Sequence, residues 1–150
     1  EGFVEIVRQS IEEAGIAPSQ IEIEITENVL IESLENSKQS LAALNSLGVR
    51  LALDDFGTGF SSLTYLRHLP VKTLKIDKSF TARILEDRVQ EGFIRSIIDM
   101  AHVLSLHVVA EGVETEAQLA KLEQIHCDVV QGYVFSKPVA REEALRLLTR

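Results

Sequence analysis

The sequence is poor in the residues that mark several special classes of protein. It holds a single cysteine, Cys127, so an internal disulfide is excluded and a reducing compartment is expected. The three prolines and eight glycines are too few for a low-complexity or largely disordered chain. No apolar run approaches the roughly 20 residues of a membrane span, and the N-terminus has no signal-peptide pattern. These absences predict a cytoplasmic domain without a membrane span.

Basic residues are also in the minority. The chain has 15 Lys and Arg against 23 Asp and Glu, a formal net charge of -8 at pH 7. This balance argues against binding to DNA or to an anionic membrane. It leaves an anionic substrate open, because carboxylates that hold divalent cations present a positive face locally. The composition, 45% hydrophobic and 25% charged, is otherwise that of one globular domain.

Helical and strand patterns alternate along the chain. Alternating or short apolar runs predict strands at residues 21–26, 49–54, 71–77, 106–111 and 128–135. Apolar residues at helical spacing predict helices within residues 3–14, 34–47, 61–69, 93–104, 115–122 and 140–148. A helix followed by five strand–helix units predicts an α/β fold with a parallel sheet, either in a (β/α) barrel or in a doubly wound sheet.

Polar residues gather at the C-terminal ends of the expected strands. They are Glu24, Asp54, Asp55, Lys75, Asp77, Glu111 and Gln131. Such a rim carries the catalytic groups of a barrel, and in an open sheet it lines a crevice. Neighbouring strand residues point to opposite faces, so Asp54 and Asp55 are expected where the strand stops. Gly57 and Gly59 favour a turn there.

Carboxylates that converge on one rim repel each other unless a cation neutralises them. Oxygen ligands suit Mg²⁺ or Mn²⁺, and two such ions about 3.5–4 Å apart are common in phosphate ester hydrolysis. Lys75 would orient a water or stabilise developing charge at such a site. Zinc is poorly supported, because the histidines and the cysteine lack a zinc-like spacing.

Each rim residue also has a simpler interpretation. A single acid at a strand end more often caps a helix or lies in solvent, and Lys75 can simply pair with a nearby acid. Glu111 and Glu114 flank Gly112 and would favour the start of the next helix. Gln131 could be a turn residue. Only the coincidence of five polar strand ends favours a shared site.

Five motifs are spread along most of the chain, from residue 22 to residue 138. They are EIEITEN (22–28), LALDDFGTGFSSL (51–63), LKIDKSF (74–80), VVAEGVET (108–115) and QGYVFSKP (131–138). Together they resemble the EAL domain, a family of bacterial cyclic-di-GMP phosphodiesterases. The resemblance implies a TIM-like (β/α) barrel, of which residues 1–150 would hold about five C-terminal strand–helix units of eight. It also implies metal-dependent hydrolysis of cyclic-di-GMP to the linear dinucleotide pGpG.

The resemblance also implies a role for each rim residue. Glu24 matches a metal ligand, Asp54 a ligand that bridges two metals, and Asp55 a ligand of the second metal. Lys75 matches a lysine that positions or activates the attacking water. Glu111 matches a catalytic glutamate, either general base or second-metal ligand. The implied cofactors are two Mg²⁺ or Mn²⁺ ions. Residues near the substrate or outside the metals match Asp77, Gln131, Glu27 and Glu114, with Glu27 linked to the order of the loop after Asp55.

Two features of the family are missing. One is an early strand with the Glu-Ala-Leu motif, whose glutamate binds metal and is followed shortly by an arginine. The other is a metal-binding asparagine on the strand before the first helix of this chain. Residues 143–145 spell Glu-Ala-Leu, but they lie in the expected closing helix, and Asn28, Asn36 and Asn45 fall in or beside another helix. We therefore expect an EAL domain that is incomplete at its N-terminus, with open sheet edges and an exposed apolar interior.

Three functions remain open at this point. The retained acids and Lys75 favour a cyclic-di-GMP phosphodiesterase as the parent domain. The missing glutamate and asparagine favour a noncatalytic module that binds the nucleotide or a protein partner, and we expect the chain alone to be inactive. A structural fragment is the third possibility. By analogy with the family, residues 56–62 and the helix after Lys78 are candidate surfaces of a homodimer.

Overall fold

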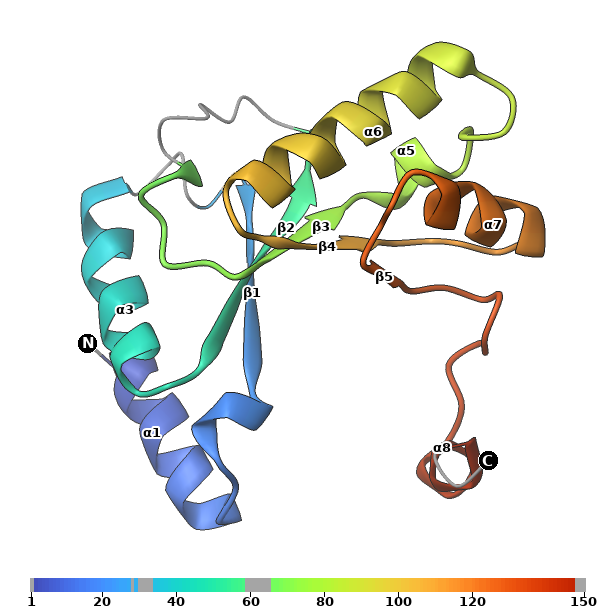
Figure 1. Ribbon diagram of the computed structural model, residues 1–150. Coiled ribbons are helices and arrows are strands. Elements are labelled where there is room, and N and C mark those ends of the chain that lie inside the picture. Colours follow the sequence, from blue (N-terminus) through green and yellow to red (C-terminus); the bar gives the residue numbers. More distant parts are fainter. Residues whose placement is uncertain (1, 28, 30–33, 59–65, 148–150) are drawn as a thin grey trace.

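The computed structural model describes residues 2–27, 29, 34–58 and 66–147, and Figure 1 shows their arrangement. The elements are α1 (Gly2–Ala14), the short 3-10 helix η1 (Pro18–Gln20), β1 (Glu22–Thr26), α3 (Leu34–Ser46), β2 (Arg50–Phe56), β3 (Thr73–Ile76), α5 (Lys78–Thr81), α6 (Arg88–Val103), β4 (His107–Ala110), α7 (Glu116–Gln124), β5 (Val129–Val130) and α8 (Arg141–Leu147). No helix among these residues is long and apolar enough to cross a bilayer.

The five strands form one sheet in the order β1-β2-β3-β4-β5. Every neighbouring pair is parallel, so each connection passes to the next strand along the sheet. A doubly wound sheet reverses its strand order at a switch point, and this sheet does not. The sheet is therefore part of a TIM-like barrel, which confirms the fold that the family resemblance implies and one of the two architectures that the strand–helix alternation left open.

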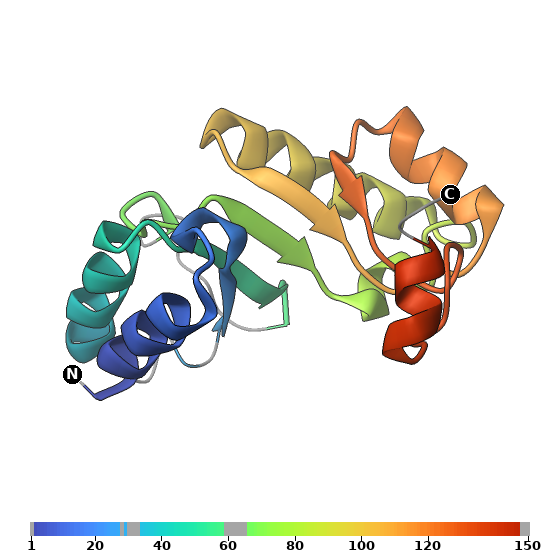
Figure 2. The same ribbon diagram turned by 90° about the horizontal axis from the view of Figure 1, so that it is seen from below.

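One face of the sheet is buried beneath helices. In β2, β3 and β4 most of the side chains on this face are at most 1% exposed, among them Leu51, Leu53, Leu74, Ile76 and Val108. They belong to the same core cluster as Ile94, Ile98 and Ala101 of α6. Figure 2 shows α6 running along one side of the sheet. Strand alternation puts the remaining strand residues on the opposite face.

The opposite, open face is mostly polar. Strand register places Glu22, Glu24 and Arg50 there, all exposed, together with Thr73 and the exposed His107. The expectation of an exposed apolar interior is therefore wrong for the described strands. The reason is that the apolar residue of each alternating pair faces the helices, as in Ile23 and Leu51.

Some boundaries differ from those that the sequence predicts. The strand expected at residues 128–135 is only Val129–Val130, and α6 begins at Arg88 because Asp87 caps its first turn through the backbone N–H groups of Val89 and Gln90. The helix expected at 61–69 lies mostly outside the described residues. Residues 143–145 lie within α8, as expected for a chance Glu-Ala-Leu.

Candidate functional site

Asp54 and Asp55 reach the same rim through an irregularity in β2. The strand does not stop at Asp54, as the sequence predicts, but continues to Phe56. Asp55 has a left-handed backbone (φ 54), and the register with β3 shifts between Leu53 and Phe56. A bulge of this kind re-aims a side chain, and aspartate tolerates the left-handed region better than most residues. Two adjacent carboxylates can therefore lie on one side of the sheet.

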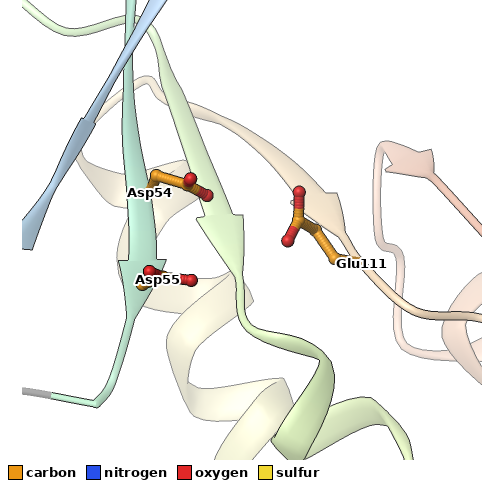
Figure 3. Close-up of side chains that lie close together, drawn as sticks. All are labelled: Asp54, Asp55 and Glu111. Carbon is orange, nitrogen blue, oxygen red and sulfur yellow. The ribbon is translucent and has the colours of Figure 1, made fainter.

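Glu111 completes a group of three carboxylates. It follows β4 directly, and one oxygen atom from each of Asp54, Asp55 and Glu111 lies within 4.8 Å of the others. Figure 3 shows the three side chains pointing into the space between β2 and β4. All three are half-buried.

Lys75 lies in the middle of these acids. Its side chain is only 6% exposed, and its Nζ lies 2.5 Å from Glu24 Oε1, 2.6 Å from Glu111 Oε1 and 3.4 Å from Asp54 Oδ1. Burial by itself would lower the pKa of Lys75. The hydrogen bonds to Glu111 and Glu24 and the nearby negative charges outweigh that effect and raise the pKa above its usual value. Lys75 is therefore an ammonium that joins acids of β1, β2 and the loop after β4.

Negative charge exceeds positive charge in this cluster. Four carboxylates (Glu24, Asp54, Asp55, Glu111) and one ammonium would carry a charge of -3 when all are ionised. Burial, followed by repulsion from Asp54 and Asp77, raises the pKa of Asp55. Asp54 Oδ1 is buried and lies 3.4 Å from Lys75 Nζ, but it accepts no hydrogen bond among the described residues. An all-oxygen set with excess negative charge fits a hard divalent cation such as Mg²⁺ or Mn²⁺.

Glu27 and Asp77 contact the backbone beside the cluster. Glu27 is 1% exposed, and its Oε2 accepts a hydrogen bond from the backbone N–H of Gly57 at 3.2 Å, two residues after Asp55. Asp77 caps α5, since its Oδ1 accepts the N–H of Ser79 at 3.0 Å. Burial would raise the pKa of Asp77, but the hydrogen bonds from Ser79 lower it overall. Both residues thus hold backbone near the rim.

Gln131 and Glu114 lie in a pocket next to the acids. The pocket has a volume of about 240 Å³ and shares Glu111 with the cluster. Its lining residues are Lys78, Glu111, Gly112, Glu114, Gln131, Gly132 and Tyr133. Lys78 and Tyr133 did not emerge from the sequence as site residues, although both lie inside the motifs LKIDKSF and QGYVFSKP. Their positions inside these two motifs could have identified them as site residues.

The chain belongs to the EAL domain family, whose model matches residues 1–138. A curated relative, the cyclic di-GMP phosphodiesterase NbdA of Pseudomonas aeruginosa, is 48% identical over 147 residues. That match covers 96% of this chain but 19% of NbdA, so the chain spans about a fifth of the relative's length.

Solved structures share the fold. The PaMucR phosphodiesterase in complex with c-di-GMP superposes with a TM-score of 0.91 at 36% identity, over 95% of this chain and 58% of the other. BlrP1 of Klebsiella pneumoniae, solved with c-di-GMP and either calcium or manganese, gives a TM-score of 0.84 at 32% identity, over 90% of this chain and 34% of BlrP1. These neighbours place a cyclic dinucleotide and divalent metal ions within the family.

Proposed function

We propose that this chain supplies most of the active site of a phosphodiesterase that hydrolyses cyclic-di-GMP to linear pGpG with two divalent cations. The observation that carries the proposal is the buried ammonium of Lys75 among Glu24, Asp54 and Glu111, with Asp55 beside them. The similar proteins NbdA and PaMucR, both named phosphodiesterases, support the same activity.

Each acid has a proposed part in holding the metals. Asp54 would serve as a ligand of both ions, Glu24 of the first, and Asp55 and Glu111 of the second. When bound, the cations would supply the Lewis-acid chemistry that activates a water and a phosphate ester. Mg²⁺ and Mn²⁺ both accept oxygen ligands, so either ion suits this set.

The proposed part of Lys75 is to donate hydrogen bonds to the reacting groups. An ammonium has three N–H donors and no acceptor, so it can hold a water or a phosphate oxygen while it stays bonded to a carboxylate. Gln131 and Glu114 are proposed to contact the substrate from the adjoining pocket, which Glu111 shares. Asp77 and Glu27 are proposed to support the rim from outside the metals.

We also propose that further strands of the natural protein complete the barrel. Among the described residues, β1 and β5 each pair with one strand only, which leaves both edges of the sheet available. The sequence lacks the family's Glu-Ala-Leu strand and metal-binding asparagine, so the first metal would lack two ligands in this chain alone. The alternative function of the parent domain is a noncatalytic module that binds the nucleotide or a protein partner.

We also propose that the natural protein is cytoplasmic and that it forms a homodimer. The exposed apolar residues Leu85, Val89 and Phe93 lie on or just before α6, and Phe93 stacks on Phe80 with ring centroids 5.2 Å apart. This surface overlaps the one expected to form a homodimer, near the helix after Lys78. Sedimentation of the natural protein with Val89→Glu would test it, since the charge should dissociate such a dimer.

The proposed activity is tested in the natural protein that contains these residues. We expect metal-dependent formation of pGpG from cyclic-di-GMP, loss of turnover on chelation, and a fall in kcat of about a thousandfold in Asp54→Asn. Asp99→Asn is a matched control, because Asp99 is exposed on α6. Binding of cyclic-di-GMP without any pGpG formation would favour the noncatalytic module instead.

A further inference from the structure

The loop after β4 packs directly on α5. A side chain at Gly112 would put its Cβ 2.4 Å from Lys78 Cβ and 3.2 Å from Lys78 Cα. Gly112 also has a left-handed backbone (φ 66), which favours glycine. The backbone next to Glu111 therefore lies against the helix that follows β3, the strand of Lys75.

Thr81, the last residue of α5, ties this contact to Glu111. Its side chain is fully buried, and its Oγ1 donates a hydrogen bond to the backbone oxygen of Glu111 at 2.5 Å. The same hydroxyl lies 3.0 Å from the backbone oxygen of Lys78. A hydroxyl carries one hydrogen, and the shorter contact is the one to Glu111.

Gln118 joins the other end of the loop to the same helix. This residue of α7 is 8% exposed, and its Nε2 donates to the backbone oxygen of Thr81 at 3.3 Å. Its Oε1 accepts the backbone N–H groups of Glu114 at 2.9 Å and Thr115 at 3.0 Å. One amide therefore connects the C-terminal end of α5 with the backbone three residues after Glu111.

We propose that Thr81 and Gln118 are positioning residues for Glu111, which fix the backbone at and beyond it so that its carboxylate meets those of Asp54 and Asp55. The side chain of Glu111 is held by Lys75 of β3, whereas its backbone is held by Thr81 of α5. The inference rests on the proposed function, in which Glu111 is a metal ligand.

The first test replaces the hydroxyl of Thr81. Thr81→Val keeps the shape of the side chain but not the donor, and Thr81→Ser restores the donor. In the natural protein we expect Thr81→Val to weaken Mn²⁺ binding, measured by calorimetry without substrate, by about 10-fold, with a similar fall in kcat. The KM for cyclic-di-GMP should change little. Thr81→Ser should recover both quantities.

The second test uses a matched pair of glutamines. Gln90 of α6 donates through Nε2 to the backbone oxygen of Phe80 at 3.3 Å, the same length as the bond from Gln118 to the next residue. Gln118→Met also removes the acceptor for Glu114 and Thr115, whereas Gln90→Met leaves that loop untouched. We expect weaker Mn²⁺ binding and faster hydrogen exchange at residues 113–115 in Gln118→Met only.

The outcomes separate the inference from the proposed function. If the wild type hydrolyses cyclic-di-GMP and both Thr81→Val and Gln118→Met bind Mn²⁺ as tightly as it does, the positioning inference is wrong and the function stands. If the wild type and Gln90→Met neither bind Mn²⁺ nor form pGpG, the function is wrong and the inference falls with it. Thr81→Val and Gln118→Met are independent tests. If one of these variants does not fold, the other still decides the inference.

Discussion

Lys75 should contribute to stability as well as to the proposed chemistry. Lys75→Met leaves Glu24, Asp54 and Glu111 facing one another without their shared ammonium. Removal of one partner of a buried pair costs about 3–5 kcal/mol, and we expect about 2 kcal/mol here because Glu24 is 48% exposed. Urea denaturation would measure the free energy of unfolding.

Lys121→Met is the control for that substitution. The Nζ of Lys121 lies 3.4 Å from Glu91 Oε2 near the surface, with side-chain exposures of 28% and 23%. A pair of this kind contributes less than about 1 kcal/mol. Equal losses in the two variants would contradict a special role for the buried ammonium.

The rim residues were predictable from the sequence, but their geometry was not. Parallel strands end at one edge, so polar residues at the ends of apolar strands by themselves indicate a shared site. The alternation rule, however, requires a strand to stop before two neighbouring acids can lie together. In the structure β2 does not stop there. A bulge with a left-handed backbone at Asp55 brings the two acids to the same side instead, and no residue pattern around Asp54 predicts that bulge.

At the level of elements, Gly132 should be important for stability although it lies in a loop. A Cβ there would lie 2.1 Å from the backbone oxygen and 2.4 Å from the backbone nitrogen of Val113. We expect Gly132→Ala to lower the free energy of unfolding by about 2 kcal/mol or more, because the backbone must shift. Thermal unfolding would measure the loss.

Gly92→Ala is the matched control for Gly132→Ala. Gly92 lies within α6, and a Cβ there has nothing within 4 Å. Alanine in a helix interior is favoured over glycine by about 0.8–1.0 kcal/mol, so this variant should be more stable than the wild type. A destabilised Gly92→Ala would mean that the two glycines cannot be compared in this way.

The close approach of Gly132 to Val113 explains why the length of β5 could not be predicted from the sequence. The run of residues 128–135 is apolar enough for a strand, yet regular pairing ends at Val130. Beyond it the chain follows Val113, whose N–H donates to the backbone oxygen of Gln131 at 3.2 Å and whose oxygen accepts the N–H of Val134 at 3.0 Å. Tertiary contacts of this kind override strand propensity.

Asp128 links α6 to the start of β5 and should make stability depend on pH. Its Oδ2 lies 2.9 Å from His102 Nε2 and accepts the N–H of Val108 at 2.8 Å. Burial would raise the pKa of Asp128, but these bonds lower it overall. Its stabilising contribution is therefore complete above the unfolded pKa of about 3.9 and is lost as pH falls through the folded pKa.

Asp128→Asn tests this dependence. We expect the variant to lose about 1–2 kcal/mol of unfolding free energy at pH 7, with a smaller difference from the wild type below about pH 4. Urea titrations at several pH values would show the convergence. A difference that stays constant down to about pH 2 would assign the loss to something other than the charge.

For the whole molecule, the chain alone should be inactive while the natural protein is active. We expect the 150-residue chain to form little or no pGpG, because the proposed first metal lacks two ligands. The measurement is turnover of cyclic-di-GMP with Mn²⁺ by the purified chain. Rapid conversion that Asp54→Asn abolishes would show that these residues suffice.

The alternation of strands and helices could not by itself decide between a barrel and a doubly wound sheet, because both folds have it, and only the resemblance to the EAL family implied the barrel. Only the spatial order of the strands separates them, and it depends on contacts between distant segments such as Leu53 with Leu74. The sequence likewise predicted an apolar open face. Alternation within β1 and β2 instead puts Glu24 and Arg50 on that face.

The left-handed backbone at Asp55 also constrains how this protein can evolve. Asparagine and glycine fit that conformation with little strain, whereas β-branched residues do not. A lineage can therefore replace Asp55 by Asn and lose a proposed metal ligand while the bulge persists. Under the proposed function, a chain that keeps the fold but has lost turnover would lie one substitution away, so a phosphodiesterase of the proposed kind could become a receptor without first unfolding.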